Sequence, residues 1–452
     1  MECRDVYALA ARLATWRVKL ARQSGADRAG DVDRYADAAQ PVVRPLAAPA
    51  KSPRPDAGEH RGKAALLANH PPFVTHQYHA VDPAALLHGS RQPWRPPVRL
   101  NGVAWNFAAG PARLPDVVLE RAAVELFQRG GDGACALERP FTGPDFRATL
   151  AHAKQRLAEL LKLPVNYTVL FLAGGAMQQF SLLPLNLCRP QQAAAYVNSG
   201  YWSGRAMVEA SKQVHAVDFL PPADGVWAVP ADYAYCHITP NETVDGSAYP
   251  AIPETGTVPL VADCTSSFLT APLAVEKFGF IYASAQKNIA PAGLTVAIIR
   301  NDLLERCPAN LPAAFSYRRQ AKANSCVNTP PMFAIQMAAM VFDWIAEQGG
   351  LVEMAAAGQR KAALLYGAID GSGGFYLAPV ALAWRSPVNI RFHLAAPELT
   401  ENFIAEAAAA GLHHLRGHAH FGGLRASLYN AMPEAGALAL ASFMADFARR
   451  YG

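Results

Sequence analysis

The stretch IYASAQKNIAPAGLT, residues 281–295, joins an apolar run, a lone lysine and a loop of small residues. The apolar run predicts a buried strand, and Lys287 follows it between Gln286 and Asn288. An ammonium group at the end of a buried strand loses hydration unless another group pairs with it. The sequence therefore leaves open whether Lys287 is an ordinary surface charge or a reactive amine.

Around this stretch, short apolar runs alternate with helical patterns. Runs such as YTVLFLA (167–173) and VPLVADC (258–264) are apolar almost throughout, and each is followed by small or polar residues. Buried strands separated by helices are typical of a mainly parallel sheet that is covered on both faces. We therefore predict an α/β large domain over residues 96–345 and a smaller α+β domain over 346–452.

The first 95 residues have a different composition. Residues 1–100 contain 15 lysines and arginines against 9 acidic residues, whereas the remaining chain contains 26 against 27. We interpret residues 1–95 as a basic, Ala/Pro-rich and partly disordered extension. Its residues 6–20 have helical apolar spacing, which fits a helix packed on the body or a helix that binds a membrane surface or partner. A near-neutral body argues against nucleic-acid binding.

The remaining composition narrows the class of protein. The chain has 452 residues, of which 51% are hydrophobic and 17% charged, as expected of a soluble globular protein. No apolar run is long enough to span a membrane and no secretion signal is present, so we expect a cytoplasmic location. The seven cysteines include no C-x-x-C pair, which argues against a disulfide framework and against a zinc site.

Several strand ends carry residues with chemical potential. Asp263 ends an apolar strand, and a buried aspartate needs a cation or backbone N–H groups. Trp202 lies in a Gly/Ser loop, where it could stack on a flat ligand or pack in the core. Gly174 and Gly175 precede an expected helix, so they form either a plain turn or a phosphate site. Together with Thr243 and Lys287, these residues match a site for an aldehyde cofactor with a pyridine ring and a phosphate.

Over residues 106–452 the sequence resembles the phosphoserine aminotransferases, which are class V pyridoxal-phosphate enzymes. The resemblance is carried by NFAAGPARLP, GGAMQQFSLLPLNL, GYWSGRAMVEA, PNETVDG, ADCTSSFLTAP, YASAQKNIAPAGLT, NTPPMFA and GGLRASLYNAMP. It implies the type I fold of these enzymes, with a mainly parallel seven-stranded sheet. It also implies amino transfer between L-glutamate or 2-oxoglutarate and a 2-oxo acid, which is 3-phosphohydroxypyruvate in serine biosynthesis.

The resemblance also implies roles for individual residues. Lys287 forms the Schiff base with pyridoxal 5'-phosphate and moves the substrate proton, while Asp263 partners the pyridine nitrogen. Trp202 stacks on the ring, and Thr243 donates to the phenolic oxygen. The positions that match phosphate ligands are Ala176, Met177 and Gln286, together with Asn328 and Thr329 from a neighbouring subunit. We therefore expect a homodimer whose active sites are shared between the subunits.

The substrate pocket departs from the family pattern. Arg425 and His418 match family residues that bind the substrate, but Phe141 and Thr142 replace a His-Arg pair, and Ala419 replaces an arginine. Loss of these charge-assisted contacts weakens the binding of a dianion. Two hypotheses follow: a less charged 2-oxo acid as acceptor, or a true phosphoserine aminotransferase with a rearranged pocket.

Two further alternatives remain open. The class V fold also hosts lyases and desulfurases, and a desulfurase needs a mobile cysteine. Cys326 is the only cysteine near a cofactor motif, and packing also explains it. A non-catalytic, partner-binding homologue is the other alternative, but the presence of Lys287, Asp263, Trp202 and Thr243 together argues against it.

Overall fold

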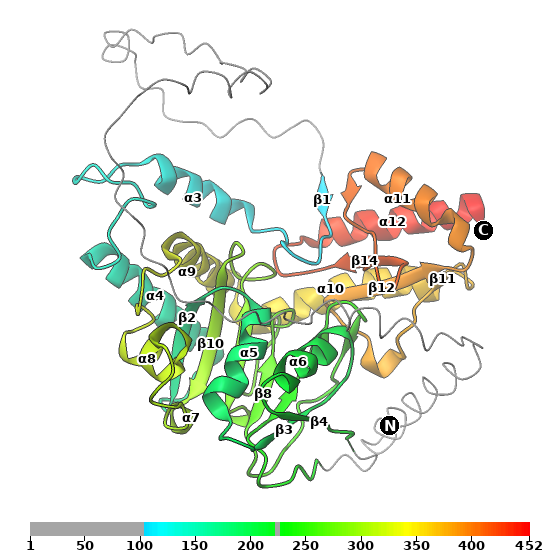
Figure 1. Ribbon diagram of the computed structural model, residues 1–452. Coiled ribbons are helices and arrows are strands. Elements are labelled where there is room, and N and C mark those ends of the chain that lie inside the picture. The colour runs from blue at the N-terminus through cyan, green and yellow to red at the C-terminus, as the bar shows by residue number, and fades with distance from the viewer. Residues whose placement is uncertain (1–103, 222–226) are drawn as a thin grey trace, which may run out of the picture. The chain divides into compact units, whose positions relative to one another are not determined.

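A computed structural model describes residues 104–221 and 227–452, and these belong to one compact unit (Figure 1). The basic extension predicted over residues 1–95, including its amphipathic helix, lies outside these ranges. Among the described residues, no helix is both long enough and apolar enough to cross a membrane.

A seven-stranded sheet forms the centre of the large domain. The strands lie in the order β2-β10-β9-β8-β5-β3-β4. All neighbours pair in parallel except β10, which runs antiparallel to both β2 and β9. The strands are β2 (Tyr167–Ala173), β3 (Ala193–Tyr196), β4 (His215–Asp218), β5 (Cys236–Ile238), β8 (Leu260–Asp263), β9 (Phe280–Ser284) and β10 (Leu294–Arg300). The predicted mainly parallel seven-stranded sheet is confirmed.

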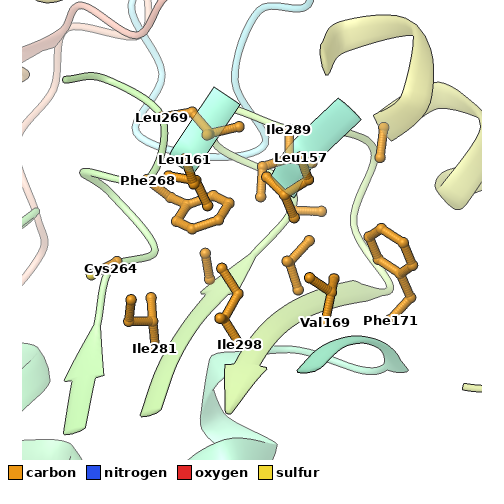
Figure 2. Packing of buried hydrophobic residues seen from close by; sticks show 14 of the residues in the cluster. Leu157, Leu161, Val169, Phe171, Cys264, Phe268, Leu269, Ile281, Ile289 and Ile298 are labelled. Carbon is orange, nitrogen blue, oxygen red and sulfur yellow. The ribbon is translucent and has the colours of Figure 1, made fainter. Parts of the chain in front are cut away.

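Two hydrophobic clusters cover the two faces of this sheet because successive strand residues point to opposite sides. In β9, for example, Ile281 belongs to one cluster, whereas Phe280 and Tyr282 belong to the other. Figure 2 shows the first cluster, in which Leu157 and Leu161 of a covering helix face the side chains of the strands. The alternation explains why these strands are apolar on both faces.

Helices supply the outer layers. The large-domain helices are α3 (Asp116–Phe127), α4 (Pro144–Leu161), α5 (Ala176–Leu187), α6 (Tyr201–Ser211), α7 (Asn301–Leu304), α8 (Tyr317–Lys322) and α9 (Met332–Glu347). Side chains of α4 and α9 join the first cluster, and those of α5 and α6 join the second. A hairpin of β6 (Asn241–Glu242) and β7 (Ser247–Ala248) follows β5.

The C-terminal part has a core of its own. Its elements are α10 (Gly350–Asp370), β11 (Tyr376–Leu377), β12 (Asn389–Leu394), α11 (Thr400–Ala409), β13 (Leu412–His413), β14 (Leu424–Ser427) and α12 (Glu434–Tyr451). Strands β11, β12 and β14 form an antiparallel sheet. The domain boundary at residue 346 stays a prediction, because α10 contributes side chains to the large-domain cluster as well as to the C-terminal one.

The first described strand also belongs to the C-terminal core. Strand β1 (Trp105–Asn106) pairs in parallel with β13, about 300 residues later. Phe107 is fully buried in the C-terminal cluster. The first described residues therefore pack in the small domain, although they precede the large domain in the sequence.

Candidate active site

A pocket of about 180 Å³ lies where the strands of the large sheet end. It is lined by Gly175, Ala176, Met177, Trp202, Thr239, Asn241, Thr243, Asp263, Thr265, Ser266, Ser284, Gln286 and Lys287. Parallel strands place their carboxyl ends on one edge of a sheet, which is where ligands of α/β proteins bind. The structure thus brings together seven residues that the sequence proposed for a cofactor: Ala176, Met177, Trp202, Thr243, Asp263, Gln286 and Lys287.

Lys287 lies three residues beyond the end of β9 and is only 8% exposed. Its Nζ donates a hydrogen bond to Oγ1 of Thr243. Burial lowers the pKa of Lys287 to about 8, against the opposing effect of the negative charge on Asp263. At pH 7 about a tenth of this amine is therefore unprotonated, against well under a hundredth for an ordinary lysine, and an unprotonated amine is a nucleophile and a base.

Asp263 ends β8 and is buried, with 4% of its surface exposed. Its Oδ1 accepts a hydrogen bond from the backbone N–H of Thr265 at 2.9 Å, and the Tyr282 hydroxyl also bonds to the carboxylate. Burial raises the pKa of Asp263, while these hydrogen bonds and the charge of Lys287 act in the opposite direction. The carboxylate faces the pocket and would gain from a cationic ligand group.

A hydrogen-bonded chain behind Asp263 was not foreseen from the sequence. Nε2 of His237 lies 2.9 Å from the hydroxyl of Tyr282. Burial lowers the pKa of His237 to about 3, so the ring is neutral, and its Nδ1 has no hydrogen-bond partner among the described residues. A proton on Nδ1 would be an unsatisfied buried donor, so the proton belongs on Nε2. His237 then donates to Tyr282, and Tyr282 donates to Asp263.

The amino end of α5 forms a second wall of the pocket. Gly174 adopts a positive φ of 106° in the turn from β2, and a Cβ there would lie 1.8 Å from Oε1 of Gln178. Only glycine fits this turn. The first N–H groups of a helix have no partner within the helix, and they carry the positive end of its dipole. Those of Ala176 and Met177 are therefore available to an anion.

The amino end of α6 is fixed by two buried carboxylates. Glu242 accepts hydrogen bonds from the backbone N–H groups of Trp202 and Ser203, each at 2.9 Å, and Asp245 accepts one from Tyr201 at 2.8 Å. Burial, together with the nearby Asp245, raises the pKa of Glu242 to about 7. Both carboxylates thus fix the backbone that carries Trp202. No local capping pattern indicates this arrangement, because the two acids lie 40 and 44 residues after the backbone groups that they bind.

Comparison with known proteins fits this arrangement. The Aminotransferase class-V profile matches residues 104–440. A phosphoserine aminotransferase of Acidithiobacillus ferrooxidans is 47% identical over 363 residues, which cover 78% of this chain and 100% of the relative. One of Stenotrophomonas maltophilia is 48% identical over 359 residues, covering 77% and 99%. Among solved structures, the phosphoserine aminotransferase from Bacillus circulans subsp. alkalophilus has a TM-score of 0.75 and 41% identity, covering 77% and 99%.

This chain belongs to the class-V aminotransferase family. The resemblance noted in the sequence is thereby confirmed, and the chain is a pyridoxal-phosphate-dependent transaminase. The solved structure of an aspartate aminotransferase from Thermus thermophilus shares 23% identity at a TM-score of 0.61, which shows the common fold alone.

The pocket of this class-V aminotransferase fits the cofactor of its family. Trp202 Nε1 and Thr239 Oγ1 are buried in the pocket wall without a hydrogen-bond partner among the described residues. Buried polar atoms are normally paired, so two unpaired ones beside a cavity indicate a polar ligand. A buried carboxylate, a buried amine and a helix amino end match a pyridinium, an aldehyde and a phosphate, respectively.

The predicted substrate residues are not all at this pocket. Arg425 on β14 approaches it, with Nη1 at 3.5 Å from the carbonyl oxygen of Thr243. The ring of His418 lies 4.7 Å from that of Tyr201, the neighbour of Trp202. Phe141 instead packs against the large-domain core, Thr142 is exposed, and neither lines the pocket.

The two residues expected to serve a neighbouring subunit also lie elsewhere. Asn328 lines a separate cavity together with Gln178, Tyr317 and Gln320, and Thr329 lines neither cavity. Their placement outside the pocket of their own chain is compatible with service to a second subunit, and their role stays a prediction.

Proposed function

We propose that this chain transfers the amino group of L-glutamate to 3-phosphohydroxypyruvate, forming phosphoserine and 2-oxoglutarate. The observation that carries the chemistry is the contact of the buried Lys287 amine with Thr243, in one pocket with the buried Asp263. The choice of acceptor is supported by the names of the relatives, which are 45% to 48% identical. It is also supported by the cationic guanidinium of Arg425, which contacts the pocket residue Thr243.

The cofactor would be held by residues from several strand ends. Asp263 would hold a proton on the pyridine nitrogen, Trp202 would cover the ring, and Thr243 would donate to the phenolic oxygen. The N–H groups of Ala176 and Met177, with Gln286, would bind the phosphate. Pyridoxal phosphate supplies an aldehyde that bonds amines and an electron-poor ring that stabilises negative charge on the substrate α-carbon.

Lys287 would carry out the proton transfers. The buried amine would hold the cofactor through its aldehyde. With its pKa near 8, the same amine would act as the base that takes the proton from the substrate α-carbon and as the acid that returns it. Arg425 would orient the substrate by a two-pronged contact with its carboxylate.

A homodimer is part of this proposal. One solved relative, from Trichomonas vaginalis, is described as a PLP-bound phosphoserine aminotransferase and is 36% identical to this chain. In a dimer, Asn328 and Thr329 of one subunit would complete the phosphate site of the other. Sedimentation equilibrium should give twice the chain mass of 48.4 kDa, and a stable monomer with full activity would contradict a shared site.

The direct test combines a spectrum with an assay. The purified chain, supplied with pyridoxal phosphate, should show a visible absorbance band that bleaches when L-glutamate is added. 3-Phosphohydroxypyruvate should then restore the band and yield phosphoserine. Absence of any visible band would contradict the proposed cofactor, whereas bleaching without recovery would contradict the proposed acceptor.

A second candidate acceptor is an unphosphorylated 2-oxo acid. It is favoured by Phe141, Thr142 and Ala419, which stand where family members carry cationic residues. A comparison of kcat/KM for 3-phosphohydroxypyruvate and 3-hydroxypyruvate separates the two candidates. Preference for 3-hydroxypyruvate, the less charged acid, would replace our first proposal with the second.

A further inference from the structure

Arg391 lies on β12, in the middle strand of the small-domain sheet. Its neighbours Ile390 and Phe392 are fully buried in the small-domain core. Because side chains alternate along a strand, Arg391 points to the opposite face, as Asn389 does. Asn389 on that face contacts the pocket residue Asn241, with 2.8 Å between the amide nitrogen of Asn241 and the amide oxygen of Asn389. Arg391 is thus on the side of its strand that faces the large domain.

Arg391 and Arg425 are direct partners across β12 and β14. Burial lowers the pKa of Arg425, and the positive charge of Arg391 lowers it further. Burial and the charge of Arg391 also lower the pKa of His393. Bringing like charges together is unfavourable, and an anion bound between them removes that cost. The paired guanidinium groups therefore favour an anionic ligand beside them.

Contacts around Arg391 lead to the pocket from both sides. On one side Arg425 contacts Thr243, which contacts Lys287. On the other side the guanidinium of Arg391 lies 5.2 Å from the ring of Phe421. From there the contacts run through ring pairs: Phe421 with His418 at 6.3 Å, His418 with Tyr201 at 4.7 Å, and Tyr201 with Trp202 at 5.2 Å. Trp202, Thr243 and Lys287 all line the pocket, so both series of contacts connect Arg391 to the pocket wall.

Arg391 also touches the loop in which the family pattern is broken. Its Nη2 donates to the carbonyl oxygen of Phe421 at 3.3 Å, only two residues from Ala419. Ala419 stands where the family carries an arginine, so a guanidinium reaches the same loop from the neighbouring strand. Another guanidinium reaches the pocket wall nearby, since Nη2 of Arg205 lies 3.8 Å from Sδ of Met177.

We propose that Arg391 determines substrate specificity by binding the distal anionic group of the 2-oxo acid, while Arg425 binds the carboxylate at the reacting end. A guanidinium donates two parallel hydrogen bonds to a phosphate or carboxylate, which suits this role. The inference rests on the proposed amino-transfer function. It also opposes the hypothesis that the missing family cations imply a less charged 2-oxo acid as acceptor.

The test compares two acceptors that differ in one charged group. Arg391→Ala should lower kcat/KM for 3-phosphohydroxypyruvate by about ten- to a hundredfold, the usual effect of a lost charge-assisted hydrogen bond. For 3-hydroxypyruvate the change should stay within about threefold, because the guanidinium has no phosphate to bind there. The visible band of the cofactor-loaded protein and its bleaching by L-alanine, which has no distal acid, should be unchanged.

Two further variants control this test. Arg416→Ala removes an equal charge from an exposed residue near the same loop, where Arg416 pairs with Glu401, and it should have no effect on either acceptor. Arg391→Ala/Ala419→Arg restores a guanidinium to the loop and should recover at least part of the lost kcat/KM.

Three results would overturn the inference: equal losses on both acceptors, no loss on the phosphorylated one, or a wild-type preference for the unphosphorylated one. A wild-type protein without turnover on any 2-oxo acid would instead overturn the proposed function.

Discussion

The two halves of the site are built in different ways. In the cofactor half, Asp263 ends one strand of the large sheet, Lys287 follows the neighbouring strand, and each is held by a hydrogen bond to a buried threonine. In the substrate half, Arg391 and Arg425 come from the small domain, and aromatic contacts link Arg391 to the large domain. Covalent chemistry requires a particular amine at a particular place, whereas an anion needs only a guanidinium within reach. The cofactor residues can therefore be predicted from local motifs. The guanidinium that binds the substrate anion, in contrast, can come from different positions in the sequence.

Substitution of Lys287 should have the largest effect, and it should not discriminate between substrates. Lys287→Ala removes the nucleophile and the base, so kcat should fall by at least about 10²- to 10⁴-fold for every acceptor. Stopped-flow and steady-state assays would measure it. As a control, Lys277→Ala removes a surface lysine that pairs with Glu254, and it should leave kcat unchanged. Multiple turnover by Lys287→Ala at a rate near wild type would refute the role of this residue.

Glu242 links the two halves, because it holds the helix end that carries both Trp202 and Tyr201. The pKa of Glu242 is raised to about 7 in the folded protein, from 4.5. As pH rises from about 4.5 to 7, the unfolded chain loses this proton before the folded one, so this group lowers stability over that window. In Glu242→Gln, the fall in the free energy of unfolding between pH 4.5 and pH 7 should be smaller than in the wild type by about 1 to 3 kcal/mol.

Chemical denaturation at pH 4.5 and pH 7, with the cofactor removed, would measure the change. Glu254→Gln, at an exposed carboxylate, is the matched control and should leave the profile as it is. An unchanged slope in Glu242→Gln would show that Glu242 is already ionised in the fold.

The pH dependence of cofactor uptake isolates the cofactor half. Only the unprotonated amine of Lys287 reacts with an aldehyde. The pKa of this amine is lowered to about 8, so the unprotonated fraction grows until the pH passes that value. The rate at which cofactor-free protein takes up pyridoxal phosphate should therefore rise about tenfold per pH unit below 8 and level off above it. Stopped-flow absorbance measures this rate. A rate that rises until pH 10 would mean that burial does not lower the pKa of this amine.

The chain behind Asp263 should give the smallest effects of the set. Tyr282→Phe removes a hydrogen bond to a buried carboxylate and should weaken cofactor binding by about tenfold or more. His237→Phe acts through Tyr282 and should weaken cofactor binding by about threefold. The visible band should shift its pH dependence in both variants, and both acceptors should be affected equally. A loss confined to the phosphorylated acceptor would place this chain in the substrate half and would break the comparison.

The sequence was most informative where function requires fixed residues in order along one sheet. Strands that run parallel end at one edge of the sheet, so the residues at the strand ends from Ala176 to Lys287 could be proposed as one cofactor cluster. The His237–Tyr282 chain could not, because its two residues lie on separate strands and read simply as core. Arg391 was also missed, since its meaning comes from the register that sets it opposite Arg425, and one strand does not reveal its register.

Short-range patterns also missed the strand that begins the described chain. A two-residue strand such as β1 has no periodicity, and its partner β13 lies about 300 residues away. Phe141 and Thr142 illustrate the opposite limit. Their alignment to family residues fixes a position in the sequence, but in this chain those residues do not line the pocket.

Residues 105–112 connect the two halves mechanically. Trp105 donates to the carbonyl oxygen of Gly411 at 2.8 Å in the small domain, and Ala112 donates to that of Gln286 at 2.8 Å, next to Lys287. Any rotation of the small domain that carried Arg391 and Arg425 toward a substrate would pull on this segment. The segment would then transmit a rotation of the small domain to the loop that carries Lys287. Binding of the substrate by the two arginines and the position of the Lys287 amine would therefore change together.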